Sequence, residues 1–190
     1  LFLKKMKIEK IYSFEASTQN FQVLKRKISK KNLDKVEIYN FGMGDKVSKS
    51  YINQSIESSS STMNEVNEKS KYLKKKLKIL NIRDKHVFYH KIPIQVITLD
   101  SFVEKHNIQN IDLLKIDTEG YEFNVLKGAS KHSQKIKLIY FEHHYDDMII
   151  KNYKFGDIHN LLEEKGFKMI KKSKMLFRKS FEYVYENQKN

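Results

Sequence analysis

The sequence predicts an α/β fold with a doubly wound, mostly parallel sheet that ends in an antiparallel edge. The main observation is that short apolar runs, typical of buried strands, alternate with helical patterns along the chain as far as Tyr145. A second observation is a pair of runs with alternating polarity, 167–170 and 181–185, after the last predicted helix. At 190 residues the chain fits a single domain over residues 1–190 with a substantial core.

The first elements form a strand–helix–strand unit. Residues 8–15 are predicted to be a strand that ends in Glu15, residues 18–29 a helix, and residues 36–41 a second strand. Such a unit implies two parallel strands joined by a right-handed crossover. An acid that ends the second strand of a nucleotide-binding sheet can accept both ribose hydroxyls, so Glu15 is a candidate ribose ligand. The alternative is that Glu15 is a surface acid next to a helix start.

The middle of the chain is less regular. The serine-rich stretch within residues 46–64 predicts a flexible loop, with a lid over a ligand as the alternative. Residues 64–82 have the apolar stripe and lysine-covered face of an amphipathic surface helix, which could also lie on a membrane or on nucleic acid. Residues 86–99 then have strand character, and Pro93 suggests an edge or a bend.

The most informative stretch is the junction 111–128. An apolar run, 111–116, changes abruptly to Asp117-Thr118-Glu119-Gly120, and a short helix that ends at Gly128 follows. In open α/β sheets ligands bind where the carboxyl ends of strands meet helices. We therefore interpret Asp117 and Glu119 as site residues, although the same residues could simply cap the helix.

A further buried strand, 136–145, ends in Glu142, His143 and His144. Adjacent side chains of a strand point to opposite faces, so the two histidines cannot both face one site while the strand is extended, and no metal site is predicted. Together with Glu15 and Asp117, Glu142 is the third acid at a strand end. We expect these three carboxylates to lie along one rim of the sheet and to face a common hollow.

Several motifs resemble the FkbM family of S-adenosylmethionine-dependent methyltransferases. The matching residues are Phe14-Glu15, Leu99-Asp100, Lys115-Ile116-Asp117, Glu119-Gly120, Leu126-Lys127-Gly128-Ala129, and Glu142 with His144. The resemblance implies a Rossmann-like class I methyltransferase sheet and S-adenosylmethionine as the cofactor. It also implies a small-molecule or glycan acceptor that is methylated on a hydroxyl oxygen.

The resemblance gives roles to the candidate residues. Glu15 would bind the ribose of the cofactor, and the loop with Gly44 and Asp45 would lie beside the adenine, although a plain turn explains those two equally well. Asp117 or Glu119 would orient the acceptor or take its proton. Glu142 and His144 are the next candidates for that role.

The resemblance also implies that the chain begins after the family's first strand and glycine-rich loop. No G-x-G-x-G-like segment occurs in the sequence. The chain is therefore expected to be N-terminally truncated: a fragment of a longer protein, a decayed copy, or an inactive fold in which the neighbouring strands close up. As given, it is expected to bind S-adenosylmethionine weakly or not at all.

Composition limits the other possibilities. There are no cysteines, which excludes disulfides and a catalytic thiol, and no apolar run is long enough to span a bilayer, so a cytoplasmic protein is expected. The net charge of +14 comes mainly from scattered lysines and predicts a solvated surface rather than a nucleic-acid reader. Two alternatives stay open: a nicotinamide-dependent oxidoreductase, because an acid after the second strand also suits that cofactor, and a non-catalytic polyanion-binding module.

Overall fold

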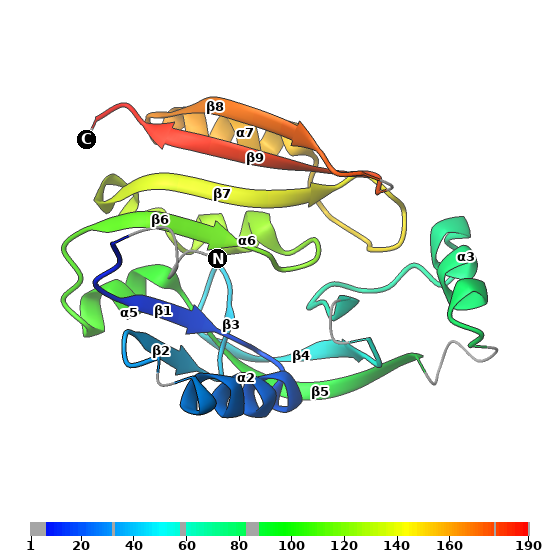
Figure 1. Cartoon of the computed structure of the whole chain (residues 1–190). Helices are drawn as coiled ribbons and strands as arrows, with labels where there is room; N and C mark the ends of the chain where they lie inside the picture. The colour runs from blue at the N-terminus through cyan, green and yellow to red at the C-terminus, as the bar shows by residue number, and fades with distance from the viewer. Residues whose placement is uncertain (1–6, 32, 58–59, 83–87, 177, 190) are drawn as a thin grey trace.

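The computed structural model describes residues 7–31, 33–57, 60–82, 88–176 and 178–189. In this part of the chain the strands form three sheets, in the orders β1-β2, β3-β5-β4 and β6-β7-β9-β8 (Figure 1). The strands are β1 Ile11–Phe14, β2 Val36–Tyr39, β3 Gly42–Met43, β4 Ser48–Ser55, β5 Tyr89–Ile97, β6 Ile111–Ile116, β7 Ile136–His144, β8 Phe167–Lys174 and β9 Ser180–Asn187. The helices are α2 Thr18–Lys30, α3 Lys71–Ile79, α5 Leu99–Lys105, α6 Glu122–Lys127, α7 Phe155–Glu164 and the 3₁₀ turn η2 Ser133–Lys135.

The predicted N-terminal βαβ unit is confirmed. β1 and β2 pair in parallel, with Ile11 opposite Val36, and α2 connects them. The helix begins after Ser17, whose hydroxyl oxygen accepts a hydrogen bond from the Asn20 amide (3.2 Å). This N-cap satisfies a backbone donor that the first helical turn leaves free, so the helix can begin only a few residues after β1 ends at Phe14.

The C-terminal sheet also follows the prediction. β6 pairs with β7 in parallel, whereas β9 pairs antiparallel with both β7 and β8. The main core lies between this sheet and its helices, and its buried members include Phe141, Tyr183, Tyr185 and Ile158. Parallel strands that are covered by helices are rich in apolar residues, and this explains why β6 and β7 are mainly apolar, with only Asp112, Lys115 and Lys137 as exposed charges before Glu142.

The middle of the chain differs from the prediction. The expected loop over 46–64 contains β4, which pairs antiparallel with β5 along its whole length. The expected helix over 64–82 is confirmed only as α3, because Ser70 is its N-cap and accepts a hydrogen bond from the Leu73 amide (3.1 Å). The Ser70 hydroxyl also donates to Asp147 (2.6 Å), so residues before 70 pack against the β7–α7 loop instead of extending the helix.

A single continuous doubly wound sheet is not confirmed. Among the described residues β1 pairs only with β2, and β6 pairs only with β7, so one edge of each strand has no ladder partner. The two edges belong to strands that face each other across the centre of the molecule (Figure 1). The observed architecture is therefore a mixed α/β fold in three sheets. No helix in the described ranges is both long and apolar enough to cross a membrane.

Candidate functional site

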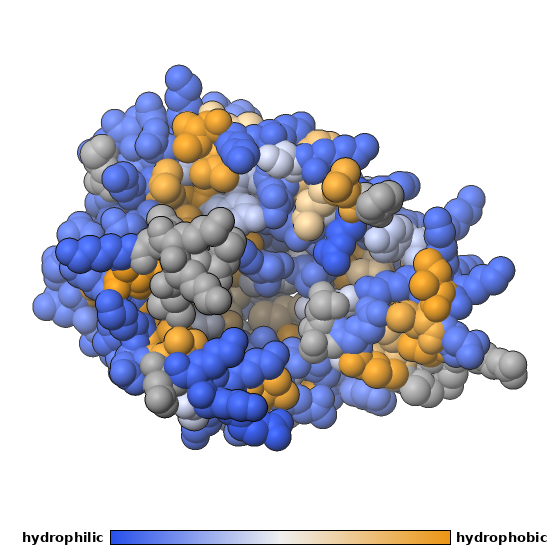
Figure 2. All heavy atoms as spheres, viewed as in Figure 1, coloured by the Kyte–Doolittle hydropathy of each residue, from blue (hydrophilic) through white to orange (hydrophobic). Residues whose placement is uncertain are grey.

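A cavity of about 490 Å³ lies between the end of β1 and the ends of β6 and β7. Figure 2 shows the corresponding face as mostly hydrophilic, with a hollow near its centre. The lining combines apolar side chains of the N-terminal half with polar ones of the C-terminal half. Its members include Phe14, Glu15, Asn20, Phe41, Met43, Thr62, Met63, Lys115, Asp117, Thr118, Glu119, Tyr140, Glu142, Arg178 and Glu182.

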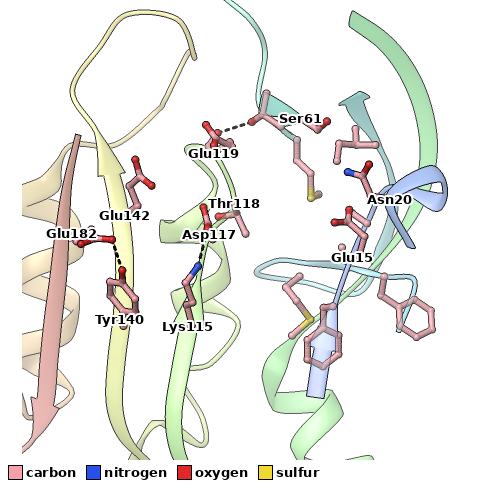
Figure 3. Close-up of a pocket in the computed structure, with 18 of the residues that line it drawn as sticks. Glu15, Asn20, Ser61, Lys115, Asp117, Thr118, Glu119, Tyr140, Glu142 and Glu182 are labelled. Carbon is pink, nitrogen blue, oxygen red and sulfur yellow. Dashed lines mark hydrogen bonds and ion pairs between the residues drawn. The ribbon is translucent and has the colours of Figure 1, made fainter. Parts of the chain in front are cut away.

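The three carboxylates predicted to share a hollow do so. Glu15, Asp117 and Glu142 all line this cavity, with Glu15 on the opposite side of the opening from the other two (Figure 3). The reason is the one anticipated from the sequence. β6 and β7 are parallel, and β1 runs in the same sense (Figure 1), so the residues at the carboxyl ends of the three strands reach the same edge. Counting Glu119 and Glu182, carboxylates outnumber the two lining cations, Lys115 and Arg178.

Glu15 is held at the start of α2. One of its carboxyl oxygens accepts a hydrogen bond from the Ser17 amide (2.8 Å), and its own carbonyl oxygen accepts one from the Asn40 side chain (2.8 Å). Burial raises the pKa of the Glu15 carboxyl, and the Ser17 amide partly offsets this. The side chain is therefore fixed in place and presents its remaining acceptor capacity to the cavity.

Asp117 and Glu119 occupy different environments although they are two residues apart. The Asp117 carboxylate pairs with Lys115 (2.7 Å), and its side chain is 53% exposed. The Glu119 side chain is 15% exposed and lies 3.4 Å from Nε2 of His144. Burial raises the pKa of Glu119 to about 7; nearby His144 opposes this rise, while Asp117 and Glu142 add to it. The raised pKa of Glu119 suits a general base that works near neutral pH.

The backbone at Glu119 is unusual. Its φ is +48°, in the left-handed region, and the following Gly120 has a φ of +93°. For a residue other than glycine this conformation costs roughly 1–2 kcal/mol. Such strain persists where surrounding contacts determine the conformation, and it is concentrated at functional sites.

His144 connects the acids at this edge. Its Nε2 lies 3.2 Å from the Glu142 carboxylate as well as near Glu119, and its Nδ1 lies 3.5 Å from Asp146. Burial lowers the pKa of His144, but the hydrogen bond with Asp146 and the nearby Glu119 and Glu142 carboxylates raise it by more, so the net direction is upward. The imidazole is thus stabilised in its protonated form by three carboxylates.

Comparison with known proteins identifies the family of the chain. The model of the FkbM methyltransferase domain matches residues 1–169. The chain belongs to the FkbM methyltransferase family. A solved structure, the methyltransferase FkbM from Methylobacillus flagellatus KT, is 16% identical and superimposes with a TM-score of 0.57, which shows a shared fold. The match covers 96% of this chain and 38% of that one. A search of curated proteins found no sequence that matches the chain significantly.

Of the predicted residues of this FkbM domain, His144, Gly44 and Asp45 lie outside the cavity lining, although His144 contacts Glu119 and Glu142, which belong to the lining. Gly44 packs behind it: a Cβ at Gly44 would lie 2.8 Å from the Val96 side chain, and a Cβ at Gly128 would lie 2.0 Å from the Gly44 carbonyl oxygen. Asp45 pairs with Lys127 of α6 at 3.3 Å. The two glycines therefore allow the end of α6 to approach the loop after β3, whereas the preceding Met43 lines the cavity.

The adjacent histidines separate as predicted from the strand period. His143 points to the opposite face of β7 from His144, and its Nδ1 lies 2.5 Å from the Glu122 carboxylate. Both side chains of this second pair are almost fully buried, at 4% and 1% exposure. His143 therefore belongs to the packing of α6 against β7 and not to the cavity.

Sequence reasoning missed two groups of the FkbM domain site. Asp146 supports His144, and the hydroxyl of Thr62 donates to the Glu119 carbonyl oxygen (2.8 Å). The Asp146-Asp147 pair after the histidines was a usable signal for the first of these. For Thr62 the only signal was the serine-rich run that it ends, which was considered as a lid, and nothing in that run pointed to a contact with Glu119. Within the ranges that the structure describes, no cluster of three or more His, Asp or Glu residues has the arrangement of a metal site.

Proposed function

We propose that this FkbM domain transfers a methyl group from S-adenosylmethionine to a hydroxyl oxygen of a small or glycan acceptor. The observation that supports the proposal best is the Glu119 carboxyl group. It faces the cavity beside His144, and its pKa of about 7 suits a general base.

The cavity has suitable residues for the cofactor. The half-buried Glu15 carboxylate at the end of β1 is placed to accept hydrogen bonds from a ribose diol. Phe14, Phe41 and Met63 add apolar surface for a flat ring to the lining. S-adenosylmethionine supplies, when bound, a methyl group that an oxygen nucleophile can attack. The chain's contribution is then to hold and deprotonate the acceptor.

The acceptor side is the acidic end of the cavity. Glu119 would accept the proton of the acceptor hydroxyl, and His144 would stabilise the negative charge of the carboxylates around it. Glu142 and Asp117, both on the lining, would accept hydrogen bonds from further hydroxyls of the acceptor. Placing the acceptor in this way is the larger part of catalysis, because methyl transfer is a direct displacement that needs alignment.

Two variants test the assignment separately. We expect Glu119→Gln to lower kcat for transfer of a labelled methyl group by about 10²- to 10⁴-fold, the usual contribution of a general base, with cofactor affinity retained. We expect Glu15→Gln to weaken S-adenosylmethionine binding, measured by calorimetry, by about tenfold or more, the scale of a lost hydrogen bond to a charged group.

Glu65→Gln, at an exposed glutamate near α3, is the matched control and should change neither quantity. Full methyl transfer by the Glu119 variant would contradict the proposed base. The weak cofactor binding expected for the 190 residues stays a prediction. The same calorimetry decides it, and micromolar affinity would contradict it.

The alternatives predict other ligands for the cavity. Nicotinamide dinucleotide would bind, and hydride transfer would be observed, if the chain were an oxidoreductase. The acidic lining gives no support to polyanion binding at this place, since carboxylates outnumber cations there. A polyanion would instead use the outer lysines, with an affinity that falls steeply with salt.

A further inference from the structure

The turn that carries Glu119 is held by side chains from outside its own strand and helix. The carbonyl oxygen of Glu119 accepts a hydrogen bond from the Thr62 hydroxyl (2.8 Å). The next carbonyl oxygen, that of Gly120, accepts one from the Asn64 side-chain amide and one from the Tyr153 hydroxyl (2.7 Å). Three donors therefore bind two consecutive carbonyl oxygens of a turn whose backbone is in the left-handed region.

The Thr62 side of this contact is itself rigid. Thr62 is buried, with 1% exposure, and pairs through its backbone with Asn53 of β4 in both directions (2.8 and 3.1 Å). The Asn53 side chain donates to the Asn64 carbonyl oxygen (2.7 Å), and the Asn64 amide donates to the Thr62 hydroxyl oxygen (3.1 Å). The antiparallel ladder of β4 with β5 thus fixes the donors that reach the turn.

On the other side, Tyr153 approaches from the segment that leads into α7. Its ring lies against Phe123 of α6, with 5.0 Å between ring centroids. The turn is therefore held between β4 and the start of α7, which are far apart in the sequence. Helix α6 has no side-chain N-cap, so residues 117–121 do not hold the turn by themselves. The conformation of the turn depends on the donors from the other two segments.

We propose that Thr62, Asn64 and Tyr153 are positioning residues that hold the Glu119 carboxyl group against His144 at the cavity. The inference rests on the proposed function, because it gives these residues a purpose through Glu119. A strained turn relaxes when its hydrogen-bond donors are removed, and the carboxyl group then moves relative to its partner. Displacements of about 1 Å in a catalytic group cost on the order of 10²-fold in rate.

The test uses the titration of the His144 imidazole, followed by NMR and assigned with a His144→Gln spectrum. The charged groups around the Glu119–His144 pair are Asp117, Glu142, Lys76, Asp146, Arg178 and Lys151, the last of which donates to the His144 carbonyl oxygen. Since the Glu119 carboxylate raises the pKa of His144, moving it away lowers the titration midpoint. We expect Thr62→Val to lower the midpoint in the same direction as Glu119→Gln, whereas Thr62→Ser, which keeps the hydroxyl, titrates as the wild type.

The result that would overturn the proposal is a wild-type midpoint in Thr62→Val when Glu119→Gln shifts it. If Thr62→Val does not give a folded far-UV circular dichroism spectrum, Tyr153→Phe decides by the same criterion, because it removes only one hydroxyl donor. In methyl transfer, we expect Thr62→Val to lower kcat by about tenfold to a hundredfold with little change in cofactor affinity. A wild-type protein without transferase activity would refute the proposed function, but the titration would still decide the positioning role.

Discussion

Replacing the Glu119 carboxyl by an amide should stabilise the protein above neutral pH. The pKa of this group is about 7 in the folded protein, against an ordinary value of 4.5. Between these values the folded protein keeps a proton that the unfolded chain has lost, so the free energy of unfolding falls as pH rises through this window. At about 1.4 kcal/mol per pH unit, the full difference corresponds to about 3 kcal/mol.

Glutamine carries no charge at any pH, so Glu119→Gln escapes this penalty. We therefore expect the variant to match the wild type near pH 4.5 and to exceed it by up to about 3 kcal/mol at pH 8. The side chain is 15% exposed, so solvent screening leaves most of the effect. The measurement is urea unfolding at both pH values, followed by circular dichroism, with Glu65→Gln as the exposed control.

A stability difference between the Glu119 variant and the wild type that does not change between the two pH values would refute the reasoning. In that case the carboxyl group would titrate normally and burial would not control its protonation. A confirmed difference, combined with lost methyl transfer, would instead show that the chain keeps a destabilising carboxyl group for its chemistry.

Three further substitutions test the packing around the site. Gly128→Ala should destabilise the fold by about 1–3 kcal/mol or more, because its methyl group would meet a backbone carbonyl at 2.0 Å, whereas Gly156→Ala, with open space around it, should not. Glu122→Leu should lower the free energy of unfolding by about 3 kcal/mol, because it leaves the buried His143 without its partner. Thermal unfolding measures the effects of the Gly128 and Glu122 substitutions. Ser17→Ala should cost about 1 kcal/mol through the lost N-cap of α2, measured by urea unfolding; an unchanged midpoint would contradict the cap.

The junction 111–128 was predictable because its signals are local. An apolar run, a sudden change to acids and a terminal glycine define β6, the turn and α6 without reference to other segments. The common cavity of Glu15, Asp117 and Glu142 was also predictable, since the parallel sense of the strands alone brings their ends to one edge. The opposite orientations of His143 and His144 followed from the two-residue period of a strand.

What the sequence did not predict depends on contacts between distant segments. The loop expected over 46–64 was inferred from the serine-rich run 58–62, but the residues before this run form β4, whose backbone pairs along the whole of β5. Residues 58 and 59 of the run lie outside the described residues. The left-handed turn at Glu119 depends on hydrogen-bond donors such as Thr62, which lie far from the turn in the sequence. Gly44 and Asp45 were predicted to lie beside the adenine because they resemble a loop of the FkbM family. In the structure these two residues pack against the end of α6 instead.

The acidic lining of the cavity has a practical consequence for handling the protein. The net charge of the chain is +14, and the acid-rich lining contributes none of this excess, so we expect any non-specific attraction of polyanions during purification to act on the outer lysines. Washing with concentrated salt strips such copurifying polymers from the lysines, since screening weakens exposed charges most. Carboxylates outnumber cations on the cavity lining, so a polyanion is not attracted into the cavity. Ligand binding that is retained after the salt wash is therefore assigned to the cavity.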